Sequence, residues 1–172
     1  MGLEAWEPHA DGFSVAQICA NGHVITTTAD LSPGLQPRCP KCGAETYVKC
    51  PKCGETIKGE WPPDDSGLVT GPAFKFPSYC PHCGAGYPWQ ARKVEATRLV
   101  MRELGGLSGE QREQMAESIE ELARDTPMQD VAVIRVKKVM STVGGAVRDT
   151  LIRAVLQVAT TAAKAKLGLP PE

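Results

Sequence analysis

Seven cysteines and one histidine in the first half of the chain have the types and the spacing of metal ligands. All seven cysteines lie before residue 84, and six of them form three C-x-x-C pairs, each followed by a glycine. An odd number of cysteines with this spacing is typical of metal sites rather than of disulfides. A fourth pair lies in CANGH. The eight candidate ligands, enough for two tetrahedral sites, are Cys19, His23, Cys39, Cys42, Cys50, Cys53, Cys80 and Cys83.

The lengths of the links between these pairs predict which ligands share an ion. Seven residues separate Cys42 from Cys50, and a single strand over AETYVK would hold them roughly 26 Å apart at about 3.3 Å per residue. The links of fifteen residues before Cys39 and twenty-six before Cys80 have room for a hairpin each. We therefore expect two tandem sets: Cys19, His23, Cys39 and Cys42, then Cys50, Cys53, Cys80 and Cys83. The alternative is a cross-brace, in which Cys19 and His23 join Cys50 and Cys53.

Zinc is the ion that we expect at both sites, although iron also suits the four-cysteine set. We expect His82, which lies between two ligands in CPHC, to point outward, because the flanking cysteines already complete a pair. Four protein ligands leave no open position for a substrate. A structural zinc contributes about 10 to 16 kcal/mol of apparent binding energy, so two such ions would replace the large core that this half of the chain lacks.

The stretches ICANGH, RCPKCG, KCPKCG and YCPHCGAGYPW resemble, in this order, a double zinc ribbon. The same order of motifs, with the PW step into a helix, resembles a bacterial family that is described as a domain of unknown function. The resemblance covers residues 16 to about 90 through specific motifs, and the rest of the chain only loosely. It implies metal binding and implies nothing about a substrate.

After Cys83 the chain has neither cysteine nor histidine, and apolar periodicity predicts four helices. These helices start at Pro88, at residue 109, at Pro127 and at residue 146. Ser108 with Gln111, and Thr126 with Gln129, are predicted capping boxes. The side chains that we expect to be buried are Val94, Leu99 or Val100, Leu104, Met115, Ile119, Leu122, Ala132, Val136, Val139, Met140, Val143, Leu151, Ile152, Val155, Leu156, Ala159, Ala162 and Ala163.

The predicted fold class is a small metal-stabilised α+β protein: two tandem zinc ribbons with short antiparallel hairpins, followed by a bundle of about four helices. The predicted divisions are an N-terminal arm over 1–15, a double-ribbon domain over 16–87, a helical domain over 88–169 and a tail over 170–172.

Composition and motifs exclude several classes of function. The formal net charge is −1, from 19 basic and 20 acidic residues, which gives no overall field to attract nucleic acid. The N-terminus has early acids and no apolar run, so we expect a cytoplasmic protein without a signal peptide. The longest uncharged run after Arg153 is ten residues, too short for a membrane span. No nucleophile elbow, P-loop, dinucleotide fingerprint or zinc-protease motif occurs, so we do not expect an enzyme.

These observations favour a non-enzymatic, zinc-binding adaptor or regulator with a protein partner. The aromatic residues Trp61, Phe74 and Phe76 flank a long loop and are a candidate partner surface. A basic patch of Arg135, Lys137 and Lys138 is a second one, and the alanine-rich last helix predicts self-association. The alternative is a nucleic-acid-binding regulator that uses the ribbon lysines and aromatics. A membrane-acting effector or a metal-dependent enzyme is less favoured.

Overall fold

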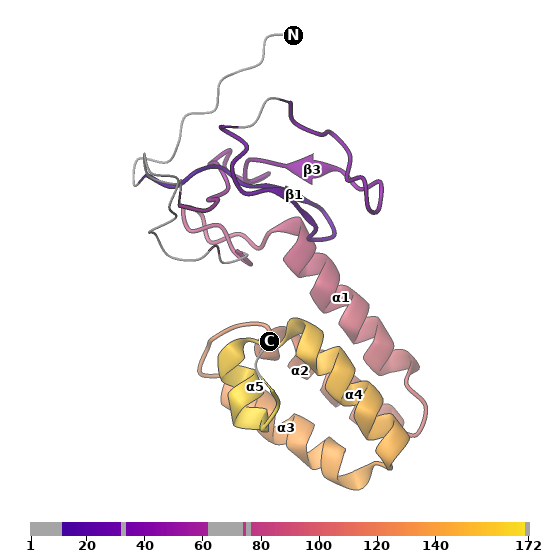
Figure 1. Cartoon of the computed structure of the whole chain (residues 1–172). Helices are drawn as coiled ribbons and strands as arrows, with labels where there is room; N and C mark the ends of the chain where they lie inside the picture. The colour runs from indigo at the N-terminus through magenta and orange to yellow at the C-terminus, as the bar shows by residue number, and fades with distance from the viewer. Residues whose placement is uncertain (1–11, 32–33, 62–73, 75–76, 171–172) are drawn as a thin grey trace. The chain divides into compact units, whose positions relative to one another are not determined.

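The computed structural model describes residues 12–31, 34–61, 74 and 77–170 (Figure 1). The chain forms two compact units, Met1–Arg92 and Lys93–Glu172. The boundary falls inside helix α1, which spans Pro88–Glu103. The three strands found in the described residues belong to the first unit, and helices α2 to α5 belong to the second. The protein is therefore of the small α+β class that the sequence predicts.

The first unit contains a small antiparallel sheet with the strand order β2-β1-β3. The strands are β1 (Gln17–Cys19), β2 (Val24–Thr26) and β3 (Thr46–Tyr47). The central strand β1 is buried along its whole length. Cys19, its last residue, is paired with Thr46 of β3, and β2 begins directly after His23. The end of β1 and the start of β2 therefore fix the positions of the candidate ligands Cys19 and His23.

The strands pair across the ligand pairs rather than inside the long links. β1 pairs with β2 across CANGH. The prediction of a hairpin between His23 and Cys39 was therefore wrong for its first strand, because β2 pairs with the strand before His23. The three C-x-x-C pairs are each flanked by one antiparallel bridge, Arg38 with Glu45, Lys49 with Thr56 and Tyr79 with Gly86. The strand predicted over AETYVK is confirmed at its centre by β3. Most of the second predicted hairpin lies outside the described residues.

The core of the first unit is small and includes two of the candidate ligands. Its large apolar side chains are Ile18, Ile57, Tyr87 and Trp89, packed with Ala16, Cys50 and Cys80. The rings of Tyr87 and Trp89 stack at 4.6 Å with an angle of 16° between their planes. The indole Nε1 of Trp89 donates to the carbonyl of Pro77 at 2.7 Å. The first turn of α1 is therefore part of this core.

The second unit packs its helices around a separate apolar core. The helices are α2 (Gly109–Leu122), α3 (Gln129–Thr142), α4 (Gly145–Val158) and α5 (Thr161–Leu167). Helix α2 contacts α3 and α4, and α3 contacts α5. The buried side chains include the predicted core residues Met115, Ile119, Leu122, Ala132, Val136, Val139, Met140, Leu151, Val155, Ala159 and Ala163.

The prediction for the middle of α1 was wrong. Leu99 and Val100 are 50% and 42% exposed, while Met101 is fully buried. The inward-facing stripe contains the buried Thr97 and Met101 and the half-buried Val94 and Leu104, at helical spacings of three and four residues. A polar residue, Thr97, occupies one position of this stripe, and its hydroxyl donates to the carbonyl of Lys93. Counting only apolar residues therefore gave the wrong register. Ala162, also expected in the core, is exposed.

Two helix boundaries differ from the prediction for one common reason. The box at Ser108 is confirmed, but Thr126 does not cap α3, which starts at Gln129. The Gln129 side chain is buried instead, and its Nε2 donates to Arg124, Asp125 and Thr160. Thr160 also caps α5 by accepting from Ala163. This buried polar network divides the predicted last helix into α4 and α5.

Within the part of the chain that the structure describes, no helix has the length and apolar character that would let it cross a membrane.

Candidate metal centres

Each pair of candidate ligands lies in a tight turn, called here a ligand turn, and the four turns share one hydrogen-bond pattern. In each, the carbonyl of the first cysteine accepts from a glycine amide at 2.8–2.9 Å, and the donors are Gly22, Gly43, Gly54 and Gly84. These glycines have φ between 70° and 87°, a region where a side chain is strained. The backbone amide of the first cysteine in turn donates to the carbonyl of a residue four or five positions later in the sequence.

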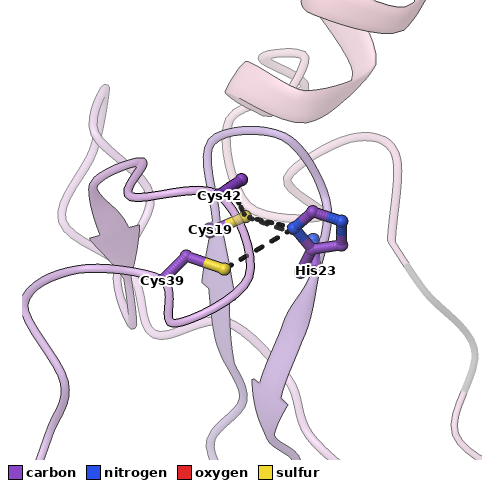
Figure 2. A group of neighbouring side chains, drawn as sticks. All are labelled: Cys19, His23, Cys39 and Cys42. Atoms are coloured by element: carbon purple, nitrogen blue, oxygen red, sulfur yellow. Dashed lines mark hydrogen bonds between the residues drawn. The ribbon is translucent and has the colours of Figure 1, made fainter.

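The first group brings together Cys19, His23, Cys39 and Cys42 from two ligand turns (Figure 2). The Sγ atoms of Cys19 and Cys42 are 3.8 Å apart. The Nδ1 atom of His23 lies 3.5 Å from the Sγ of Cys19 and 3.5 Å from the Sγ of Cys39. The imidazole therefore faces the three sulfurs with Nδ1 and not with Nε2.

The second group brings together Cys50, Cys53, Cys80 and Cys83. Its Sγ atoms lie 3.8 Å apart for Cys50 and Cys83 and 3.7 Å apart for Cys53 and Cys80. The two groups are the tandem sets expected from the link lengths. The cross-brace combination is not the one that the structure brings together.

These separations fit the edges of a tetrahedron around a zinc ion. With Zn–S bonds of about 2.3 Å, two sulfurs of a tetrahedron are about 3.8 Å apart, and a sulfur and an imidazole nitrogen are about 3.6 Å apart. A disulfide would require about 2.05 Å, and all seven cysteines are free. Thiolates and imidazole are ligands that suit zinc and, in a four-sulfur set, iron. Both groups could therefore hold a metal ion.

Burial alternates within the ligand turns. The first cysteine of every turn is buried, whereas Cys42 and Cys53 are exposed and Cys83 is half-buried. Each group therefore has one side embedded in the fold and one side toward solvent. His82 is exposed and lies outside both groups, as the sequence predicts.

Hydrogen bonds to sulfur favour the thiolate forms. The amide of His23 donates to the Sγ of Cys19 at 3.2 Å, but burial outweighs this hydrogen bond and raises the pKa of Cys19. The backbone amide of Ala44, together with the Asn21 side chain, lowers the pKa of Cys42 to about 6. Burial raises the pKa of Cys80, but the amides of Cys83 and His82 and the neighbouring sulfurs outweigh it, and the pKa falls to about 6. A thiolate is the form of cysteine that binds metal.

The sulfurs of one group also oppose one another's ionisation. The amide of Glu55 lowers the pKa of Cys53, but local desolvation and hydrogen bonds with the three neighbouring cysteines outweigh it and raise the pKa to about 12. Several thiolates in one place repel each other. A metal ion of charge +2 at this position would offset the repulsion between the thiolates.

Three residues that the sequence analysis missed, Asn21, Arg92 and Tyr87, lie beside these groups. The Nδ2 of Asn21 donates to the Sγ of Cys42 at 3.4 Å, and the Nη1 of Arg92 donates to the Oδ1 of Asn21 at 2.7 Å. Burial and the neighbouring Cys80 raise the pKa of Tyr87, which packs against the second group. No local pattern in the sequence indicates the contact between Asn21 and Arg92.

The predicted partner-binding residues are spread over both units. Trp61 is half-buried and meets Phe13 edge to face at 5.0 Å. Phe74 is half-buried against the first core, and Phe76 lies outside the described residues. On α3, Arg135 forms an ion pair with Glu117 at 3.6 Å, and Lys137 and Lys138 are exposed. The role of all six in binding a partner stays a prediction.

A family model described as an uncharacterised protein conserved in bacteria, DUF2321, matches residues 12–167. The chain belongs to the DUF2321 family. The DUF2321 match includes both compact units, so the family covers the helices as well as the residues 16–90 that carry the motifs. No curated protein and no solved structure matched the chain.

Proposed function

We propose that the first unit is a double zinc ribbon in which each group of four ligands holds one structural zinc ion. The observation that supports this most directly is the set of 3.5–3.8 Å separations between ligand atoms, which match a tetrahedral zinc site in both groups. Four protein ligands complete the coordination of zinc. This closed set favours a structural role over catalysis, which needs an open position.

Metal analysis of protein purified without any chelator tests the proposed double zinc ribbon. Elemental analysis and native mass spectrometry should give two equivalents of zinc and a colourless protein, since iron in four sulfurs would absorb visible light. Cys42→Ser and Cys53→Ser should each remove one equivalent, from different groups. Fewer than two equivalents in the unmodified protein, or loss of the same ion in both variants, would refute the double ribbon.

On this scaffold we propose a non-enzymatic adaptor that binds a protein partner. The outward face of α3 supports a docking role for the second unit. Val131 and Ile134, one turn apart, are 39% and 67% exposed, and the exposed Lys137 and Lys138 follow them. Exposed apolar side chains that lie together mark candidate protein-interaction surfaces.

Affinity capture from a bacterial lysate tests the adaptor role. Ile134→Glu and Lys137→Glu change the outward face of α3, and Arg153→Glu is the control, because it reverses an exposed charge on α4. The proposal expects a specific protein that the unmodified chain and the control retain and that the α3 variants lose. Identical capture by all variants would contradict this surface. Salt-sensitive binding of labelled RNA or DNA by the purified protein would favour the nucleic-acid alternative instead.

A further inference from the structure

A chain of hydrogen bonds connects the first metal group with helix α1. Asn21 lies inside the ligand turn between Cys19 and His23, and its Nδ2 donates to the Sγ of Cys42 at 3.4 Å. Its Oδ1 accepts from the Nη1 of Arg92 at 2.7 Å. Asn21 and Arg92 are 71 positions apart in the sequence. One amide therefore joins a candidate ligand to a residue in the second turn of α1.

The chemistry of the two neighbours allows only one orientation of this amide. A guanidinium only donates hydrogen bonds, and a thiolate only accepts them. Because Arg92 must face the carbonyl oxygen, the NH₂ group of Asn21 must face the sulfur of Cys42. Without Arg92, the amide could rotate by 180° and present its oxygen to the thiolate, which would repel it. Arg92 thus selects the favourable orientation.

Cys42 is the ligand at which this hydrogen bond matters most. It is the exposed cysteine of the first group, while Cys19 and Cys39 are buried. A chelator or an electrophile therefore reaches the group first at Cys42. A hydrogen bond from nitrogen to the thiolate stabilises its negative charge and lowers its tendency to take up a proton or an electrophile.

The position of Arg92 is itself fixed by the core of the first unit. Three residues earlier, Trp89 is fully buried and bonded to the carbonyl of Pro77. Tyr87 is stacked on Trp89 and packs with Cys50 and Cys80 of the second group. The first turn of α1 is therefore seated against the second group, and Arg92 extends from that helix to the first.

We propose that Asn21 and Arg92 are positioning residues that set how firmly the first group retains its metal ion. Helix α1 carries Arg92 and so supports the exposed corner of that group at Cys42. This inference rests on the proposed double zinc ribbon, because it concerns the retention of an ion in one of its two sites. Residues that orient metal ligands through hydrogen bonds commonly change metal affinity by about 10- to 100-fold when they are replaced.

Metal-release kinetics with the full-length, zinc-loaded protein test this inference. The chromogenic chelator 4-(2-pyridylazo)resorcinol in excess reports each equivalent of released zinc. Cys42→Ser identifies the phase that belongs to the first group, and Cys53→Ser the phase of the second. We expect Asn21→Ala and Arg92→Ala to release the zinc ion of the first group about tenfold faster and the zinc ion of the second group at the unmodified rate. Asn21→Asp should be faster still, because a carboxylate cannot donate to the thiolate and repels it.

A matched control separates hydrogen bonding from net charge. Lys41→Ala removes one positive charge directly beside the exposed Cys42, as Arg92→Ala removes one from α1, but it leaves Asn21 and Arg92 in place. Lys41→Ala should release metal at nearly the unmodified rate. Alkylation of Cys42 by iodoacetamide, located by peptide mass spectrometry, should accelerate in Asn21→Ala and not in the control.

Distinct outcomes would overturn the inference and the proposed function. An unmodified release rate in Asn21→Ala, or equal acceleration of both phases, would show that Asn21 does not act on the first group in particular. An effect of Lys41→Ala as large as that of Arg92→Ala would assign the result to charge alone. In each of these cases two equivalents of zinc still bind, so the double ribbon stands. Fewer than two equivalents in the unmodified protein would refute the double ribbon itself.

Discussion

Removal of metal should unfold the first unit while the second unit keeps its helices. The two units have separate cores. Two candidate ligands, Cys50 and Cys80, are part of the first core, and the second core contains no candidate ligand among its described residues. A strong chelator therefore acts on the contacts of one unit and has no direct target in the other.

The size of the effect follows from the side chains that the first core contains. Its four large residues are Ile18, Ile57, Tyr87 and Trp89. Burial of one such side chain contributes about 1.5 to 3 kcal/mol, so the four contribute about 6 to 12 kcal/mol. The binding of one structural zinc ion has an apparent free energy of about 10 to 16 kcal/mol. The free energy lost with a single ion is therefore comparable to the contribution of all four side chains. After loss of both ions, these four side chains alone do not keep the first unit folded.

Tryptophan fluorescence separates the two units because of where these residues occur. All three tryptophans of the chain, Trp6, Trp61 and Trp89, precede residue 93. Trp89 is fully buried, so its emission should shift to longer wavelength when the first unit unfolds. The far-ultraviolet circular dichroism of α2 to α5 should persist under the same conditions. Return of zinc should restore the fluorescence.

Two results would refute this reasoning. Unchanged emission after complete removal of zinc would show that the first unit folds without metal. A shift of the emission to longer wavelength together with loss of the helical signal would show that the second unit depends on the first. Hydrogen exchange measured by peptide mass spectrometry would locate either result in the chain.

Three further predictions concern single features. Gln129→Ala should lower the free energy of unfolding of the second unit by about 1 to 3 kcal/mol in urea titrations, because it removes the hydrogen bonds that the buried Gln129 side chain donates to Arg124, Asp125 and Thr160; an unchanged midpoint would contradict this, and Thr150→Ala on α4 is the control. Gly84→Ala should weaken zinc retention in the second group only, since φ is +70° at that glycine and alanine there costs about 1 kcal/mol or more; chelator competition measures it, and equal loss from both groups would count against it. As the pH falls the protein should release zinc, because ligands must be deprotonated to bind; retention of both ions at pH 4 in native mass spectrometry would argue against thiolate ligands.

The candidate metal groups could be predicted from the sequence because metal ligands are identified by their residue types and by the short spacings between them. The seven cysteines and His23 have few alternatives in a chain of this composition, and the short link between Cys42 and Cys50 excluded a shared ion. The pairing of the strands was predicted less well. Each ligand turn already makes a compact hydrogen-bonded unit, and a strand such as β2 pairs across that turn with β1 rather than within its own link.

The contacts that the sequence did not indicate are long-range and polar. Arg92 and Asn21 meet only because α1 starts in the core of the first unit. Gln129 has the spacing of a capping residue, yet its side chain serves a buried network that also ends α4. In both cases a local pattern describes the residue correctly as polar and leaves its partner undetermined, because the partner is set by tertiary packing.

The hydrogen bonds within the ligand turns determine which of their residues can be substituted. Each C-x-x-C turn places two residues between its cysteines, and these residues are exposed in all three turns. The chain fills them with Pro-Lys twice and with Pro-His once. Since the hydrogen bonds of the turn use backbone atoms, the side chain just before the second cysteine can be exchanged, by evolution or by a protein engineer, without disturbing the coordination beneath it.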